Sequence, residues 1–214
     1  MKKNALSKVF GWMFVGLFIT FVSAYIVSLN TNMLQNIYSG GTYWLFLVAE
    51  ILIAVFLSVR ITKMSGGLAT FLYLVYTFLT GVTFSIIFVA YEMGSIIAIF
   101  LITALLFGIF ALIGKYTKFD LSRISTYLFM GLLGIIILSF INYFVLNDTL
   151  NMIGCILGIV VFLGYTAYDI QKILKNDDYD IEDRNFAIIG AFSLYLDFIN
   201  IFIDLLNLFG DSGD

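Results

Sequence analysis

The sequence predicts an all-α integral membrane protein with seven transmembrane helices, six of them surrounding a central seventh helix. Hydrophobic residues make up 62% of the chain and charged residues only 12%, whereas soluble domains are about 45–50% apolar and about 25% charged. The apolar residues form seven long runs, and the basic residues fall into alternate connections between them. We therefore expect one seven-helix transmembrane domain over residues 1–214.

Each apolar run is close to the ~20 residues that a helix needs to cross a bilayer. The first run follows Lys2, Lys3 and Lys8, as a secretory signal would, but its core is longer than the ~7–15 residues of a signal peptide. We interpret it as a retained anchor helix, with cleavage near Ala24 as the alternative. The predicted spans cover residues of about 9–29, 43–59, 67–90, 95–114, 125–146, 150–170 and 186–209.

The eleven Lys and Arg residues indicate the orientation of the chain. They precede the first span or lie in the second, fourth and sixth connections, and none lies in the other connections or in the C-terminal tail. By the positive-inside rule, the N-terminus is cytoplasmic and the C-terminus external in the plasma membrane. The rival topology is a re-entrant last segment that returns the tail to the cytoplasm.

The last run carries a polar stripe. Its polar residues recur at intervals of four, three, four and three, which places them on one face of a helix. A carboxylate that faced lipid would be costly, so this face must meet protein or water. The last helix is therefore expected to be the hub of the bundle. The stripe consists of Ser193, Asp197, Asn200, Asp204 and Asn207.

Ionisable residues within spans mark ion paths, proton relays or partner pairs. Arg60 and Asp169 are expected at the cytoplasmic ends of the second and sixth helices, where they could pair. Asp197 lies about 16 Å into the last helix at 1.5 Å per residue, and Glu50 lies at a comparable depth. Asp204 lies about 10 Å further out on the same face as Asp197.

Asp169 is expected to approach Asp197 only if the end of the sixth helix lies deeper in the membrane than its hydropathy suggests. Two neighbouring carboxylates cannot both ionise cheaply, so such a pair would sense protons near physiological pH. The structural alternative is that each acid is neutral or hydrogen-bonded and fixes helix register.

The sequence also excludes several kinds of chemistry. It contains no histidine, which removes imidazole metal sites and His-based catalysis. The single cysteine, Cys155, is interpreted as packing material. Tyr168-Asp169 superficially resembles an element of intramembrane aspartyl proteases, but the glycine expected beside the second aspartate is missing at Asp197. We expect no enzyme activity, no cofactor and no nucleic-acid partner.

The acidic stretch 177–183 is interpreted as a solvated loop, with a cation-gathering vestibule as the alternative.

Two motifs carry a resemblance to a known family. LYLDFINIF at Leu194–Phe202 and YDIQKI at Tyr168–Ile173 resemble the Bax inhibitor-1 family, most closely a bacterial calcium-leak member, over essentially the whole chain. The resemblance implies a central seventh helix, a bacterial origin and a pH-sensitive calcium leak. It implies that Asp169 and Asp197 form a di-aspartyl proton sensor that contacts Ca²⁺ transiently, and that Arg60 latches to Asp169 in the closed form. It also places Glu50 on the ion path. Asp204 is a departure, because the family commonly has a non-acidic polar residue there.

The leading hypothesis is a proton-gated cation leak with Ca²⁺ as the permeant ion, since the polar stripe offers the oxygen ligands that hard cations prefer. The partners are then membrane lipid, Ca²⁺ and H⁺. One alternative is an H⁺-coupled Ca²⁺ exchanger that uses the same acids. Another is a non-conducting membrane regulator that binds a membrane protease or a death-pathway partner. The expected ion pathway comprises Glu50, Ser193, Asp197, Asn200 and Asp204.

Overall fold

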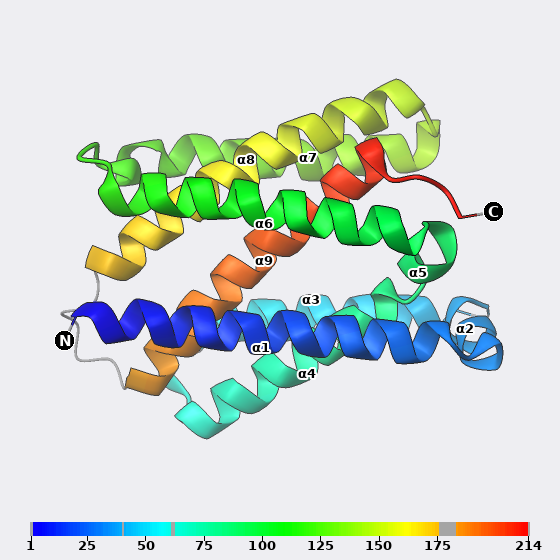
Figure 1. Ribbon diagram of the computed structural model, residues 1–214, viewed down its shortest axis with the longest axis horizontal. Helices are drawn as coiled ribbons and strands as arrows, with labels where there is room; N and C mark the ends of the chain where they lie inside the picture. Colours follow the sequence, from blue (N-terminus) through cyan, green and yellow to red (C-terminus); the bar gives the residue numbers. More distant parts are fainter. Residues whose placement is uncertain (1, 40, 61–62, 176–182, 214) are drawn as a thin grey trace. The chain divides into compact units, whose positions relative to one another are not determined.

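A computed structural model describes residues 2–39, 41–60, 63–175 and 183–213 of the protein, and these are almost entirely helical (Figure 1). The described residues contain no strand, only one isolated antiparallel bridge between Tyr91 and Ser212. The helices are α1 (Lys2–Ser28), α2 (Thr31–Tyr38), α3 (Thr42–Arg60), α4 (Gly66–Phe84), α5 (Ile87–Ala90), α6 (Met93–Tyr116), the 3-10 helix η2 (Leu121–Ile124), α7 (Ser125–Val145), α8 (Asp148–Lys175) and α9 (Asp183–Phe209).

The prediction of seven transmembrane helices is confirmed. Seven helical segments among the described residues are long and apolar enough to cross a membrane. The largest difference is at the sixth span, which continues to Lys175 instead of ending near residue 170. The acidic stretch predicted as a loop or vestibule lies mostly outside the described residues. The spans are Leu6–Ser28, Thr42–Arg60, Gly66–Ala90, Met93–Tyr116, Leu121–Val145, Asp148–Lys175 and Asn185–Phe209.

The first connection contains the short helix α2, which hydropathy did not predict. Its N-cap is Asn30, whose side chain accepts a hydrogen bond from the Met33 backbone N–H; Asn is among the preferred N-cap residues. Ile37 is buried against Val27 and Val82. The helix is thus held by one apolar face. With eight residues, α2 is too short to stand out in a hydropathy profile.

The third span is interrupted between α4 and α5 although the chain has no proline. The Tyr38 hydroxyl donates to the Thr83 carbonyl at 2.6 Å and accepts from the Ile86 N–H at 3.2 Å. The Ser85 hydroxyl bonds back to the Val82 carbonyl at 2.7 Å. Because side chains replace the helical hydrogen bonds lost at the break, the irregular backbone is tolerated inside an apolar span.

The chain divides into two compact units. Unit 1 comprises Met1–Glu92, Asp178–Tyr195 and Ser212–Asp214, and unit 2 comprises Met93–Asp177 and Leu196–Asp211. In unit 1, α1 and α4 pack closely through small residues, since a side chain added at Gly16 or Gly81 would overlap atoms of the facing helix. Close approach through small residues is the usual packing mode of membrane helices.

Unit 2 is built on α8, which packs against α6 and α7 (Figure 1). Gly114 of α6 lies directly on the Ala167 backbone, and Gly131 of α7 lies against the Val161 side chain. The α9 residues of this unit pack on α6, with the Phe198 ring 5.2 Å from the Phe100 ring centre. The apolar face of α9 is thereby directed to α6.

The α9 helix is the most enclosed of the seven spans. In its most apolar window 61% of the residues are buried, against 0–44% in the other six. At its start, the Asn185 side chain donates to the Met64 carbonyl in the second connection at 2.8 Å. The tail beyond α9 pairs with the third connection, where Gly213 N–H donates to the Ala90 carbonyl at 3.0 Å. Asn185 near the start of α9 and Gly213 in the tail therefore bond to backbone groups near opposite ends of the third span.

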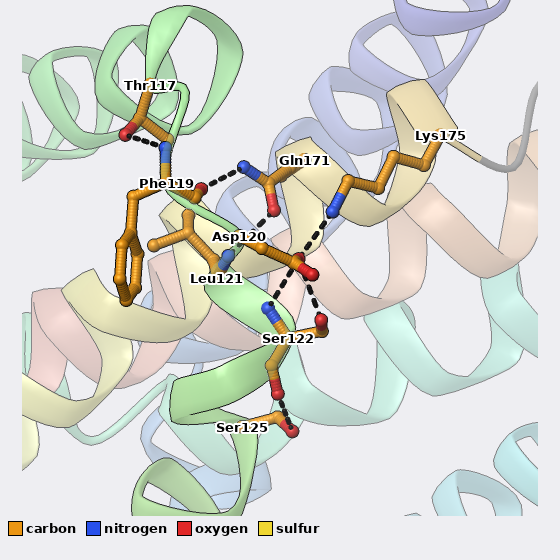
Figure 2. Close-up of polar contacts among 8 residues, drawn as sticks. All are labelled: Thr117, Phe119, Asp120, Leu121, Ser122, Ser125, Gln171 and Lys175. Carbon is orange, nitrogen blue, oxygen red and sulfur yellow. Dashed lines mark hydrogen bonds and ion pairs between the residues drawn. The ribbon is translucent and has the colours of Figure 1, made fainter.

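The connection between α6 and α7 is fixed to the end of α8 by side chains (Figure 2). Gln171 donates to the Phe119 carbonyl and accepts from the Leu121 N–H, both at 2.9 Å. Lys175 forms an ion pair with Asp120 at 2.5 Å. The bonds to Lys175 and Ser122 lower the pKa of the exposed Asp120 carboxyl to about 2. These contacts explain why α8 continues past the apolar run, since its last turn has polar partners.

Candidate ion and proton site

The polar stripe predicted on the last span lies on a continuous helix, since α9 runs from Asp183 to Phe209. Ser193 and Asn200 are half-buried, and Asn207 is exposed. The Asn200 side chain donates to the Leu196 carbonyl of its own helix at 2.7 Å. The amide of Asn200 is thus satisfied locally and leaves its side-chain oxygen as the group offered to a ligand.

Asp197 is the most enclosed acid of the stripe, with 5% of its surface exposed. Its Oδ2 atom is buried and has no hydrogen-bond partner. Most buried side-chain oxygens in proteins are hydrogen-bonded, so each exception requires an explanation. A buried carboxylate oxygen without a partner is a place where a proton or a cation would be stabilised.

Asp169 of α8 faces Asp197, and the two carboxyl groups interact electrostatically. Tyr165, about one turn before Asp169 on α8, interacts with both acids. The expectation that Asp169 closes the end of its helix is wrong, because α8 continues past it for more than a turn to Lys175. The two acids therefore interact electrostatically although α8 does not end at Asp169.

Arg60 is the last residue of α3 and is exposed. It belongs to unit 1, whereas Asp169 belongs to unit 2. The latch between Arg60 and Asp169 therefore stays a prediction, as does the role of Asp169 and Asp197 as transient ligands of Ca²⁺.

Asp204 has a different environment from Asp197. It is half-buried, and its carboxylate lies directly against Gly158 of α8. The Cys155 thiol donates a hydrogen bond to Asp204 and is also bonded to the Asn207 side chain. Cys155 was expected to be packing material only, so its polar contacts with the stripe are a finding that spacing along the chain could not predict.

Glu50 lies in α3 and is half-buried in unit 1. Its two carboxylate oxygens accept hydrogen bonds from α4, from Thr80 at 3.3 Å and from Thr83 at 2.9 Å. Neither threonine is among the residues predicted for the ion pathway. The one available signal is a repeat of hydroxyl residues along an otherwise apolar span, at Thr77, Thr80 and Thr83, which are all buried.

Among the described residues, no three His, Cys, Asp or Glu side chains gather closely enough to hold a metal ion together. Sites with few charged ligands bind Ca²⁺ weakly. The arrangement comprises an acid pair in unit 2 and, separately, a carboxylate with hydroxyl partners in unit 1.

Comparison with known proteins identifies the family. The family described as "Inhibitor of apoptosis-promoting Bax1" matches residues 2–214. The chain belongs to the Bax inhibitor-1 family. The resemblance inferred from the motifs in the sixth and seventh spans is thereby confirmed.

Bacterial relatives match the chain over nearly their whole length. The inner membrane protein YbhL of Escherichia coli is 38% identical over 96% of this chain and 91% of its own length. An uncharacterized protein of Borreliella burgdorferi is 41% identical over 98% of this chain and 93% of its own length. The uncharacterized protein RP147 of Rickettsia prowazekii is 34% identical over 99% of this chain and 91% of its own length. This member of the Bax inhibitor-1 family is thus a multi-span membrane protein.

Proposed function

We propose that this protein is a pH-sensitive leak pathway for Ca²⁺ in the bacterial plasma membrane. The observation that supports it best is the Asp197 carboxylate, which is buried beside Asp169 and has one oxygen without a hydrogen-bond partner. Such an oxygen is stabilised when it binds either a proton or a cation, and the two ligands compete for the same position.

The proton-sensing step follows from the chemistry of the pair. When both acids are ionised, their repulsion is relieved by the Arg60 guanidinium or by a bound cation. When one is protonated, the two can share a hydrogen bond, and Arg60 loses its charged partner. Acidification from pH 8 to pH 6 therefore releases the latch and raises the leak. The pathway continues through the oxygens of Ser193, Asn200 and Asp204, with Glu50 as a further acid; few fixed ligands favour conduction over storage.

The orientation belongs to the same proposal, with the N-terminus cytoplasmic and the C-terminus external. It rests on the alternation of basic connections and on the pairing of the tail with the third connection, which carries no basic residue. A cysteine placed at Ser212 should react with an impermeant maleimide added outside intact cells. Labelling only after the cytoplasmic face is opened would reverse the assignment.

The test is calcium flux into liposomes that contain the purified protein, measured between pH 5 and pH 8. Asp197→Asn keeps the shape of the side chain but removes its charge and its titration, so the flux should become nearly independent of pH. Arg60→Ala should raise the flux at pH 8. The matched control is Asp148→Asn, an exposed aspartate at the start of α8, which should behave as the wild type.

Three results would argue against the proposal in different ways. A wild-type pH profile in Asp197→Asn would place the sensor elsewhere, with Asp204 the next candidate. Flux that drives protons in fixed proportion would favour an H⁺-coupled exchanger that uses the same acids. An absence of flux, together with cell phenotypes that survive the loss of Asp197, would favour a non-conducting regulator that binds a membrane protease or a death-pathway partner.

A further inference from the structure

The surroundings of Glu50 in unit 1 form an oxygen-rich cluster that shares no residue with the acid pair of unit 2. Thr80 and Thr83 each donate to a different oxygen of the Glu50 carboxylate. Tyr76 and Tyr195 are each hydrogen-bonded to Thr80. Among the described residues no Lys or Arg forms an ion pair with Glu50. The carboxylate is therefore held by neutral hydroxyls and has no fixed counter-charge within the described structure.

Both threonine hydroxyls have a second acceptor within reach. The Thr80 hydroxyl lies 3.0 Å from the Tyr76 carbonyl, and the Thr83 hydroxyl lies 3.0 Å from the Thr80 carbonyl. A hydroxyl carries one proton and two lone pairs. If each proton turns to its backbone carbonyl, both carboxylate oxygens and a lone pair of the Thr83 hydroxyl become free to bind a ligand, and the Thr80 hydroxyl can do the same when a neighbouring tyrosine hydroxyl does not donate to it. The two threonine hydroxyls keep an acceptor in this exchange, and a bound cation would replace the two hydrogen bonds that the Glu50 carboxylate loses.

Other threonines in the spans show that the contact with Glu50 is not required to satisfy a threonine in these helices. Thr70 donates to the Gly66 carbonyl of its own helix at 2.8 Å, and Thr103 does the same with Ile99 at 2.8 Å. Such back-bonding is the ordinary solution for a threonine in an apolar helix. Thr80 and Thr83 have this solution available and still direct their hydroxyls to a carboxylate.

We propose that Glu50, Thr80 and Thr83 form a cation subsite in unit 1 that takes a hard divalent ion such as Ca²⁺. The ligands are two carboxylate oxygens and two hydroxyl oxygens, which is an oxygen-only set of the kind that Ca²⁺ prefers. One carboxylate does not neutralise a divalent ion, so the subsite binds weakly and releases readily, as a conducting path requires. The subsite gives the proposed leak a second ion position in addition to Asp197.

The subsite can be tested by equilibrium binding of Tb³⁺, a luminescent substitute for Ca²⁺ that nearby tyrosines sensitise. The whole chain in detergent is used in an Asp197→Asn background, so that the acid pair of unit 2 contributes little. Thr80→Val together with Thr83→Val keeps the side-chain shape but removes both hydroxyls. We expect the Tb³⁺ affinity to fall about tenfold, with each hydroxyl contributing about threefold. Glu50→Gln should abolish the Tb³⁺ luminescence from this subsite, which the two valine substitutions only weaken.

Two matched variants control for packing. Thr80→Ser with Thr83→Ser retains both hydroxyls and should bind as the parent does. Thr70→Val removes a buried hydroxyl from the same helix that bonds only to its own backbone, and it should leave the affinity unchanged. If the double valine variant does not fold, as judged by its melting curve, Thr83→Val alone should weaken binding about threefold.

The proposal of a subsite would be overturned if the double valine variant or Thr83→Val bound Tb³⁺ as tightly as the parent within error. The threonines would then serve only as hydrogen-bond donors to the Glu50 carboxylate. This inference rests on the proposed cation pathway, but the two can fail separately. Tb³⁺ binding that depends on the threonines, in a protein that passes no Ca²⁺ in liposomes, would reject the leak and keep the subsite. The reverse pattern would reject the subsite and keep the leak.

Discussion

Replacing Gly158 by alanine tests the packing of α8 against the polar stripe. A methyl group at Gly158 would overlap the Asp204 carboxylate, so the carboxylate must move and lose its bond from the Cys155 thiol. Overpacking of this kind costs about 1–3 kcal/mol. The lost hydrogen bond, about 0.5–1.5 kcal/mol, is roughly offset by the gain of about 0.5–1 kcal/mol when alanine replaces a helical glycine. The expected net loss of stability is therefore about 1–3 kcal/mol.

The assay is thermal unfolding of the purified protein in detergent. For a chain of this size, 1 kcal/mol shifts the midpoint by about 2–4 °C, so Gly158→Ala should melt several degrees below the wild type. Gly154→Ala is the matched control one turn away on α8, where an added methyl would make an ordinary contact of 3.5 Å with Leu138. It should be neutral or slightly stabilising.

A double-variant cycle identifies the cause of the loss. Asp204→Ser shortens the side chain that the methyl group would strike, so Gly158→Ala should cost much less in that background. Residues in contact commonly show coupling of about 0.5–3 kcal/mol. Equal melting of Gly158→Ala and Gly154→Ala, or a cycle without coupling, would refute the contact between Gly158 and Asp204.

Two further predictions follow from contacts outside the stripe. Tyr38→Phe should destabilise the protein by about 1–3 kcal/mol, because it leaves the Thr83 carbonyl and the Ile86 N–H without their partner at the break in the third span; an equal loss in the exposed control Tyr127→Phe would contradict this. The Asp120 carboxyl has a pKa lowered from 3.8 to about 2, so its contribution to stability is present above pH 4 and disappears as the pH falls from 4 to 2. The difference in melting temperature between the wild type and Asp120→Asn should shrink over that interval, and a constant difference would exclude the ion pair with Lys175 as its source.

The spans could be predicted from the sequence because transfer of apolar residues into lipid is a local property that sums along the chain. What escaped prediction depends on polar contacts between elements. The helix breaks after Phe84 because Tyr38 of α2 forms hydrogen bonds with the freed backbone groups. The sequence of the third span alone does not predict this break. The end of α8 was placed too early for the same reason, since Gln171 and Lys175 find partners in the fourth connection.

In the candidate site, too, the features within one helix could be predicted from the sequence, whereas the contacts between helices could not. The spacing of the polar residues on the last span placed Asp197 and Asp204 on one helical face, and the structure retains that face on α9. The periodicity could not show which neighbours each acid meets. The pairing of Asp169 with Asp197 stays a prediction, supported by the electrostatic interaction of the two carboxyl groups, whereas the helix end expected at Asp169 is not present, because α8 continues to Lys175. Cys155, Thr80 and Thr83 were missed because each acts on an acid of another helix.

These neighbours give two aspartates of one stripe different expected roles. Asp204 was expected to alter ion affinity or proton coupling, because the family resemblance implies a non-acidic polar residue at this position. In the structure its carboxylate already has a donor in Cys155 and lies against Gly158, whereas an oxygen of Asp197 is buried without a partner and faces a second acid. A group that is already satisfied gains less from a proton or a cation than one that is not. The response to pH and to Ca²⁺ should therefore depend on Asp197 more than on Asp204, although both are aspartates on the same helical face.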